Sequence, residues 1–378
     1  MLLERILRGL SERLDGRVGG ATRADRVICL DDSQASRQGC LLLIFGDDGA
    51  APSLVAKAAP IDAARRRAGQ PIYELEFENL RSLEQRGLNR HGPAAPLPLA
   101  AWRDAGLLFT VQTALAGELL KNVPGRALFG PQPHQQTLDS VLGWWKRFQQ
   151  CFGVQRVLLD EGLYGAMVRQ PVQQFLSRFR TEADERDFLS HRLEREQRLL
   201  GLELPLMVRH GDFCPANMLR LQRTVALFDW EFPLRHGLPL FDLFHFFASV
   251  RFPFAGLRGE SGHFASFCEV FWGASYFSRA VRGRLAEVAD EQRIPREALG
   301  DLFLLSLIEI ANLKYEALIE IHGAPPPSPG GGPGTAGSTP WELAGGTDKD
   351  VPFACIRGAA LQNLRFIVRN GPPRLLPD

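Results

Sequence analysis

The stretch His210–Glu231, with the sequence HGDFCPANMLRLQRTVALFDWE, decides how this chain is interpreted. It places Asp212, Asn217 and Asp229 within one short segment. The intervening sequence MLRLQRTVALF predicts two strands joined by a tight polar turn around Gln222–Thr224. Such a hairpin brings the ends of its strands together. We therefore expect Asn217 and Asp229 to point at one spot, with Asp212 on the loop just before it.

These three polar side chains suit metal-assisted phosphoryl transfer. Asp212 would orient an attacking hydroxyl or accept its proton. Asn217 and Asp229 would supply hard oxygen ligands for a magnesium ion that bridges phosphates. A neutral amide beside a single carboxylate limits the repulsion between the two ligands. The prediction depends on a β-turn at Arg223 that folds both side chains around one ion.

The spacing H-x-D-x-x-x-x-N, followed by an aspartate in DWE, resembles the catalytic and metal loops of the kinase-like fold. The HGD form resembles the aminoglycoside phosphotransferase and choline kinase branch rather than protein kinases. The resemblance covers roughly residues 25–320, and its specific motifs lie in 210–242. It implies an α+β, two-lobe fold with a small sheet-rich N-terminal lobe and a larger, mainly helical C-terminal lobe. It also implies ATP and Mg²⁺ as cofactors.

The same resemblance assigns a phosphate-binding pair. Lys57, in the sequence LVAK, is similar to the family's strand lysine, a compact cation that neutralises nucleotide phosphates. Glu76 is the expected partner that holds this lysine in place. Glu74 and Glu78 remain competitors on other faces of the same predicted helix, whose apolar face favours Glu76.

Further roles follow from the resemblance. Thr113–Leu115 lie where the chain is expected to cross between the lobes, so their backbone groups would meet the adenine edge. His210 is expected to brace the catalytic loop rather than to act as an acid or base. Asp242 would support the backbone of that loop. The role of Glu231 is left open: it contacts metal or substrate, or it accepts backbone hydrogen bonds.

The remaining pattern predicts a short sheet followed by helices. Strands are expected at 26–30, 40–45, 53–59 and 106–117, with a helix before Gly87. The predicted organisation is an N-terminal helix (1–24), a β-rich nucleotide-binding lobe (25–115), a helical catalytic and substrate-binding lobe (116–322), a flexible Pro/Gly-rich loop (323–349) and a closing helix that docks on the helical lobe (350–378).

Composition narrows the class of partner. The chain has 44 Lys and Arg residues against 43 Asp and Glu residues, a net charge of +1, which favours neither nucleic acid nor a membrane surface as partner. Its six cysteines show no metal-ligand spacing, which indicates free thiols in a reducing compartment. No run approaches the roughly 18 apolar residues of a membrane span. We therefore expect a soluble, cytoplasmic protein.

One departure from the family pattern keeps other functions open. The predicted phosphate loop, DDSQASRQG at 31–39, has a single glycine where protein kinases have several. An inactive nucleotide-binding module of the same fold is therefore the main alternative. A metal-dependent phosphoesterase is a third, although eight histidines without a companion motif do not favour it. The acceptor hydroxyl is left open among a sugar, an amino alcohol and an aminoglycoside-like molecule, as are nucleotide preference and oligomeric state.

Overall fold

The protein is described here from a computed structural model. The structure describes residues 2–13, 26–30, 40–45, 51–61, 66–67, 70–92, 94–120, 132–179, 181–222, 224–250, 259–322, 362–371, 373 and 375. The predicted turn residue Arg223, the predicted phosphate loop at 31–39 and the Pro/Gly-rich loop at 323–349 lie outside the described residues.

The chain forms two compact units, each built from segments that are distant in sequence. The β-rich unit comprises Met1–Val123, Asp139–Gly153 and Pro215–Leu234. The helical unit comprises Pro124–Leu138, Val154–Cys214 and Arg235–Asp378. The motif segment is therefore divided after Cys214, so that Asp212 belongs to the helical unit while Asn217 and Asp229 belong to the β-rich unit.

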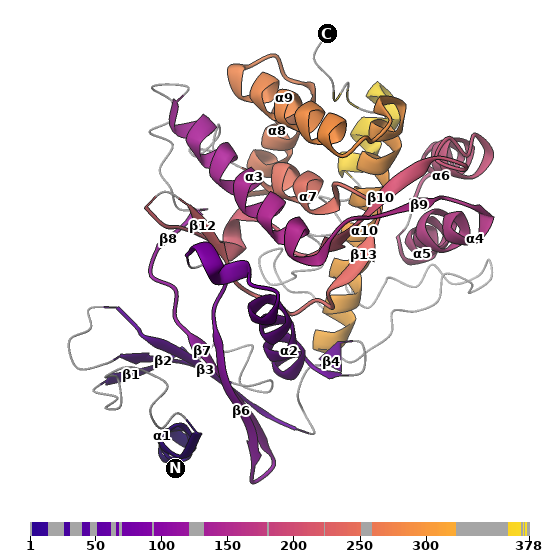
Figure 1. The fold of residues 1–378 in the computed structure, drawn as a ribbon. Coiled ribbons are helices and arrows are strands. Elements are labelled where there is room, and N and C mark those ends of the chain that lie inside the picture. Colours follow the sequence, from indigo (N-terminus) through magenta and orange to yellow (C-terminus); the bar gives the residue numbers. More distant parts are fainter. Residues whose placement is uncertain are drawn as a thin grey trace, which may run out of the picture. The chain divides into compact units, whose positions relative to one another are not determined.

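An antiparallel sheet in the order β1-β2-β3-β7-β6 forms the body of the β-rich unit (Figure 1). Its strands are β1 (Arg26–Leu30), β2 (Cys40–Phe45), β3 (Leu54–Pro60), β7 (Leu107–Thr113) and β6 (Pro98–Asp104). Four of these strands were predicted from the sequence, and β6 was not. The alternating burial of the PLAAWRD sequence in β6 identifies it as a strand with one covered face.

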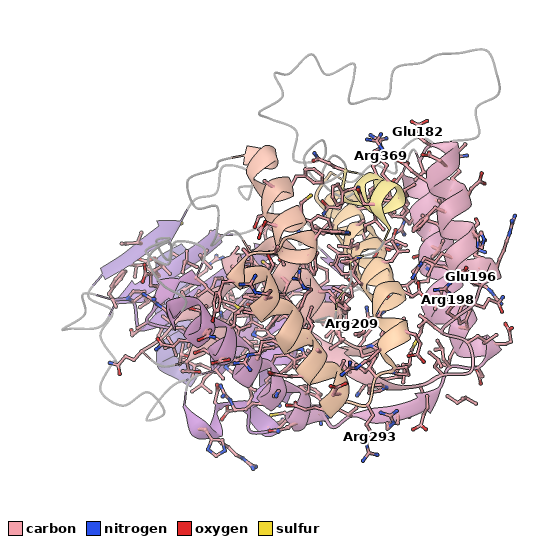
Figure 2. The ribbon with its side chains drawn as sticks, turned by 90° about the horizontal axis from the view of Figure 1, so that it is seen from above. Glu182, Glu196, Arg198, Arg209, Arg293 and Arg369 are labelled. Carbon is pink, nitrogen blue, oxygen red and sulfur yellow. The ribbon has the colours of Figure 1, made fainter. Side chains whose placement is uncertain are left out.

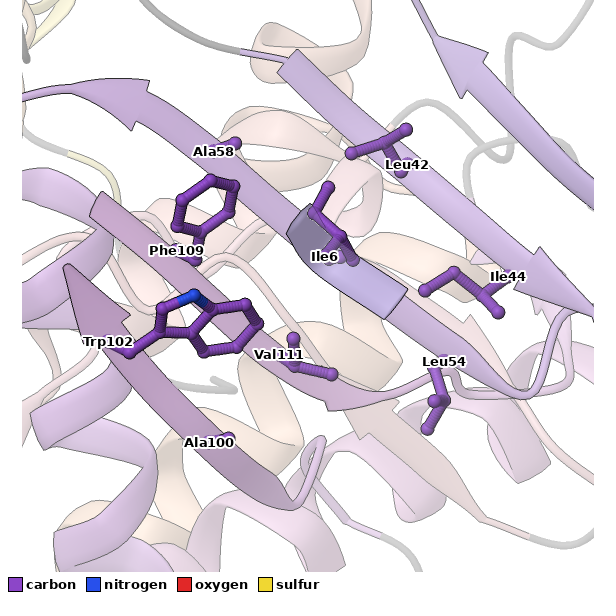
Figure 3. Packing of buried hydrophobic residues seen from close by; sticks show 10 residues of the cluster. Ile6, Leu42, Ile44, Leu54, Ala58, Ala100, Trp102, Phe109 and Val111 are labelled. Atoms are coloured by element: carbon purple, nitrogen blue, oxygen red, sulfur yellow. The ribbon is translucent and has the colours of Figure 1, made fainter. Parts of the chain in front are cut away.

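The two faces of this sheet are covered by different helices. Helix α1 (Leu2–Arg13) inserts Ile6 into an apolar cluster with alternate residues of the strands, including Ala56, Ala58 and Trp102 (Figure 3). Gly9 of α1 approaches Trp102 so closely that a Cβ atom would lie 2.5 Å from its ring. Because side chains alternate along a strand, Lys57 of β3 must point to the opposite face.

Helix α2 (Ile72–Gln85) covers that opposite face and carries Glu76. The helix ends where predicted, because Gly87 adopts a left-handed conformation with φ of +78°. A short 3₁₀ helix (Leu88–His91) follows it, and the small strands β4 (Arg66–Arg67) and β5 (Gln70–Pro71) precede it.

The predicted hairpin also belongs to the β-rich unit. Its strands are β11 (Met218–Arg220) and β12 (Val225–Leu227), and the two-residue strand β8 (Glu118–Leu119) extends them to a three-stranded sheet. A 3₁₀ helix, Pro215–Asn217, leads into β11. The long helix α3 (Gln132–Phe152) supplies the aromatic surface against which this part of the unit packs.

The helical unit contains a small antiparallel sheet in the order β13-β10-β9. Its strands are β9 (Gln155–Leu158), β10 (Glu203–Arg209) and β13 (Arg235–Gly237). The helices of this unit are α4 (Glu161–Tyr164), α5 (Gln170–Arg178), α6 (Ala183–Leu189), α7 (Phe241–Ser249), α8 (Gly259–Trp272), α9 (Tyr276–Glu291) and α10 (Leu299–His322). Turns of π-helix follow α4 (Gly165–Arg169) and α6 (Ser190–Arg195), and a 3₁₀ turn precedes α10 (Arg296–Ala298).

Ion pairs and rings connect the elements of the helical unit. Arg209 at the end of β10 pairs with Glu309 of α10. The pair of Arg198 with Glu196 is instead local, between residues two apart on the surface (Figure 2). A helix at 362–370 contacts the unit through Phe366, whose ring lies 5.0 Å from that of Trp272.

The predicted fold class is confirmed: a sheet-rich N-terminal part is followed by a mainly helical remainder. The three strands of the helical unit were not predicted, because they are short and β9 (QRVL) is largely exposed. The predicted segment boundaries stay a prediction. None of the helices among the described residues combines the length and apolar character needed to cross a bilayer. The cysteines among those residues are free thiols.

Candidate active site

The hairpin places Asn217 beside the residue that precedes Asp229. Met218 pairs with Leu227, and the carbonyl oxygen of Asn217 accepts a hydrogen bond of 3.0 Å from the backbone N–H of Phe228. The amide of Leu221 donates to the carbonyl of Thr224 at 2.9 Å and closes the turn. The main chains are thus brought together as the motif predicted, while the convergence of the two side chains on one ion stays a prediction.

The backbone of Asp229 adopts an uncommon conformation. Its φ of +68° lies in the left-handed region, which non-glycine residues rarely occupy and which is found at functional sites when surrounding structure holds it. The next residue, Trp230, is fully buried against α3, with its ring 6.1 Å from Trp144 and 5.5 Å from Phe148. The tryptophan of the DWE sequence therefore anchors the loop that carries Asp229.

Lys57 and Glu76 form an ion pair in the β-rich unit. The carboxylate of Glu76 is 2% exposed and the lysine side chain is 12% exposed. The ammonium group of Lys57 also lies 5.4 Å from the centre of the Tyr73 ring, one turn earlier on α2. The two charges are therefore held inside the unit by a strand and a helix, not by flexible surface groups.

The charge of Lys57 is secured by its surroundings. Burial lowers the pKa of this ammonium group, but the carboxylates of Glu76, Asp229 and Glu231 raise it, and the net result lies above the ordinary value for lysine. Lys57 therefore stays protonated at neutral pH. The same balance shows that Asp229 and Glu231 contribute to one local electrostatic field with Lys57.

The competing glutamates of α2 have other surroundings. Glu74 forms a two-point ion pair with Arg103 of β6, at 2.8 and 2.9 Å. Glu78 is exposed. The structure thus pairs Lys57 with Glu76, the partner favoured by the apolar face of the helix, whereas the nucleotide-binding role of the pair stays a prediction.

In the predicted hinge at Thr113–Leu115, two backbone amides already donate hydrogen bonds within the protein. The amide of Thr113 donates to the carbonyl of Leu97, and the amide of Ala114 donates to the carbonyl of Ser53, both at 2.9 Å. The Thr113 hydroxyl oxygen accepts from the amide of Leu97 at 2.9 Å. A backbone amide that donates to adenine in this segment is therefore expected at Leu115 or later in the chain.

In the helical unit, Asp242 holds the backbone of the loop that leads to Asp212. Its carboxylate accepts hydrogen bonds from the amides of His210 at 2.9 Å and Gly211 at 3.3 Å. Gly211 has a φ of +88°, a conformation that a side chain would strain. Burial raises the pKa of Asp242 to about 6, although these two amides and Arg209 lower it. Asp242 thus contacts the backbone of this loop directly, whereas its supporting role in catalysis stays a prediction.

Two histidines flank Asp212. The amide of Asp212 donates to Nδ1 of His210 at 3.2 Å, so His210 acts on the loop through its ring acceptor, as a brace would. Nε2 of His245 lies 3.5 Å from Oδ1 of Asp212. Burial, and secondly Lys314, lowers the pKa of His245 to about 3, although Asp212 raises it. His245 is therefore neutral at pH 7, and its contact with Asp212 is not an ion pair.

The donor set of the β-rich unit is chemically suited to magnesium. Asn217 and Asp229 offer an amide oxygen and a carboxylate, and Glu231 lies in the same segment. Among the described residues, no group of three or more His, Cys, Asp or Glu side chains is placed to hold a metal ion. A magnesium ion that also binds substrate phosphates needs only one or two protein carboxylates.

Sequence reasoning missed two residues near the predicted groups. The first is His245, a buried polar residue in the otherwise apolar helix α7. Asn79, on α2, donates from its side-chain amide to the carbonyls of Trp230 and Phe232, each at 2.8 Å. Its position three residues after Glu76 was the available signal, because residues three apart share one face of a helix.

Comparison with known proteins bears on the family. A profile of the phosphotransferase enzyme family (APH) matches residues 47–266, more than half of the chain. No curated protein sequence matches.

Solved structures also match at low identity. Aminoglycoside phosphotransferase APH(3'')-Id from Streptomyces rimosus, in complex with ADP and streptomycin, is 16% identical over 83% of this chain and 98% of that chain, with a TM-score of 0.43. A thermostable mutant of APH(4)-Ia, in a ternary complex with ADP and hygromycin B, is 12% identical over 97% of this chain and 98% of that chain, with a TM-score of 0.49. The assignment rests on the sequence profile: the chain belongs to the phosphotransferase enzyme family.

Proposed function

We propose that the protein is a kinase that uses ATP and Mg²⁺ to phosphorylate a hydroxyl group of a small molecule. The observation that carries this proposal is the buried Lys57–Glu76 pair, which lies in one electrostatic field with Asp229 and Glu231. A protonated lysine and carboxylates that can bind a metal ion together suit a polyphosphate ligand. The negative charge of the phosphates is then compensated by both the lysine and the metal ion.

Each residue then has a distinct task. Lys57 neutralises the nucleotide phosphates, and Glu76 fixes its position. Asn217 and Asp229 would hold Mg²⁺, which supplies charge stabilisation to the phosphates when bound. Asp212 orients the acceptor hydroxyl. As the hydroxyl oxygen forms a bond to the γ-phosphorus of ATP, the bond between that phosphorus and the departing ADP breaks, and the hydroxyl proton is released toward Asp212.

The acceptor class is a hydroxylated small molecule: a sugar, an amino alcohol or an aminoglycoside-like compound. Family membership does not choose among them, since specificity depends on the individual site. The alternative is a nucleotide-binding module without transfer activity, which the glycine-poor sequence at 31–39 favours.

An ATP-consumption screen over sugars, amino alcohols and aminoglycosides tests the proposal, with Asp212→Asn as the matched control. We expect ADP formation that depends on one acceptor class, a product heavier by one phosphoryl group and loss of both in the control. Thermal stabilisation by ATP without product from any acceptor would favour the inactive module. Absence of any nucleotide binding would contradict both.

A further inference from the structure

Asn79 makes a connection that neither the motif nor the proposed mechanism requires. Its side chain is 6% exposed, and its amide donates to the carbonyls of Trp230 and Phe232, both at 2.8 Å. These carbonyls belong to the residues on either side of Glu231, and the first of them, Trp230, directly follows Asp229. All of these residues belong to the β-rich unit.

The two hydrogen bonds reach backbone carbonyls that lie outside helices and strands. Residues 228–234 belong to no helix or strand, so the carbonyls of Trp230 and Phe232 are not paired in a strand ladder. The hydrogen bond to the Trp230 carbonyl is buried and that to the Phe232 carbonyl is partly buried, and removing the donor of a buried carbonyl costs stability. One asparagine amide with two N–H groups can serve two carbonyls at once, which few other side chains of this size can do.

The loop is therefore fixed from two sides. Trp230 is held through its ring by α3, and the backbone around Glu231 is held by Asn79 of α2. Asp229, whose φ is +68°, lies at the start of this doubly held segment. A left-handed aspartate persists when its surroundings fix it, and these contacts provide that constraint.

The same helix also carries the partner of Lys57. Glu76 and Asn79 are three residues apart, so they lie on neighbouring positions of one helix face. Any shift of α2 must move the Lys57–Glu76 pair and the loop of Asp229 together.

We propose that Asn79 is a positioning residue that holds the Asp229 loop in register with the Lys57–Glu76 pair, so that α2 sets the geometry of metal binding. This inference rests on the proposed function, because it takes Asp229 as a magnesium ligand. Asn79 itself touches neither nucleotide nor metal in this assignment.

The test compares metal binding with metal-free nucleotide binding in the full-length protein. Asn79→Leu removes both donors at similar volume. Asn312→Leu is the matched control, because Asn312 is also buried and donates to one carbonyl, that of Pro171 at 2.9 Å, in the helical unit. Mn²⁺ affinity is measured by electron paramagnetic resonance with AMP-PNP, and AMP-PNP affinity is measured by calorimetry with EDTA. Amide hydrogen exchange reports on residues 229–232.

We expect Asn79→Leu to weaken Mn²⁺ binding about tenfold or more and metal-free AMP-PNP binding less than about twofold, as for residues that orient metal ligands. Exchange at 229–232 should become faster, while Asn312→Leu should change none of these. Equal weakening of both ligands, or unchanged Mn²⁺ affinity, would overturn the inference.

Two further outcomes are distinguishable. If Asn79→Leu does not fold, Asn79→Asp provides the same comparison, since it keeps the volume and replaces the donors by an acceptor. If the wild-type protein shows no AMP-PNP-dependent Mn²⁺ binding, the proposed function fails and the inference with it. A defect confined to the Asn79 variants leaves the proposed function intact and supports the inference.

Discussion

The two units treat charge in opposite ways. In the β-rich unit, Lys57 is charged and lies in the field of three carboxylates, which raise its pKa. In the helical unit, the histidine ring beside Asp212 is uncharged at pH 7, because the pKa of His245 falls to about 3. The pKa of Asp242 rises only to about 6, so that carboxylate remains mostly ionised. The proposed chemistry explains the contrast. Polyphosphate and metal need compensating charges, whereas a single carboxylate orients a neutral hydroxyl best without a competing cation.

The largest expected effect tests the helical side of this contrast. Asp212→Asn keeps the shape of the side chain but removes its charge, so turnover with an identified acceptor should fall about 10²–10⁴-fold. Stabilisation by ATP in a thermal-shift titration should persist, because the phosphate-binding charges belong to the other unit. Wild-type turnover by this variant would remove Asp212 from the mechanism.

The next effect compares two glutamates of α2. Glu76→Gln breaks a buried ion pair and should lower the free energy of unfolding by about 3 kcal/mol or more. Glu74→Gln, the matched control, breaks the more exposed pair with Arg103 and should cost about 1 kcal/mol or less. Urea unfolding measures both, and ATP titration should show weaker binding only for Glu76→Gln. Equal losses of stability would contradict the distinction between the two pairs.

A smaller effect depends on pH. The pKa of Asp242 in the folded protein, about 6, lies above its ordinary value of 3.8, so the folded state binds the proton more tightly than the unfolded chain. This group therefore adds stability as pH falls and loses it as pH rises through 6. The free energy of unfolding should be higher at pH 5 than at pH 7, and this difference should be roughly 1 kcal/mol larger in the wild type than in Asp242→Asn. His210, Arg209 and Asp212 surround this carboxylate and stay unchanged. An identical pH dependence in both proteins would refute the shift.

The smallest effect is expected at the surface of the helical unit. Arg198→Ala removes a pair with Glu196 in which the arginine side chain is 50% exposed. The free energy of unfolding should change by less than about 0.5 kcal/mol, and turnover should be unaffected. A loss comparable to that of Glu76→Gln would show that surface charge matters as much as buried charge here.

The motif predicted the hairpin because the information is local. The polar residues around Thr224 and the apolar runs on either side specify a turn and two strands within a dozen positions. The pairing of Lys57 with one of three glutamates was harder. The helical period favoured Glu76, but the ion pair spans 19 positions and required the sheet to present Lys57 toward α2.

Other features were not accessible from the chain alone. Nothing in the sequence states that Asn79 donates to carbonyls about 150 positions away, or that the amides of Thr113 and Ala114 are already engaged. The strands of the helical unit pair segments some 30 to 50 positions apart, and β9 lacks an apolar pattern. The identity of a buried polar residue does not specify which partner it contacts in the folded protein.

By itself, the sequence determined the family, the α+β class and the types of residue available for chemistry, because these depend on motifs and on periodicity within single elements. Tertiary structure decided which glutamate faces Lys57 and how Asn79 and Trp230 hold the loop of Asp229. It also decided which groups keep His245 uncharged and raise the pKa of Asp242. Those outcomes depend on burial and on hydrogen-bond partners that come together only when distant segments pack.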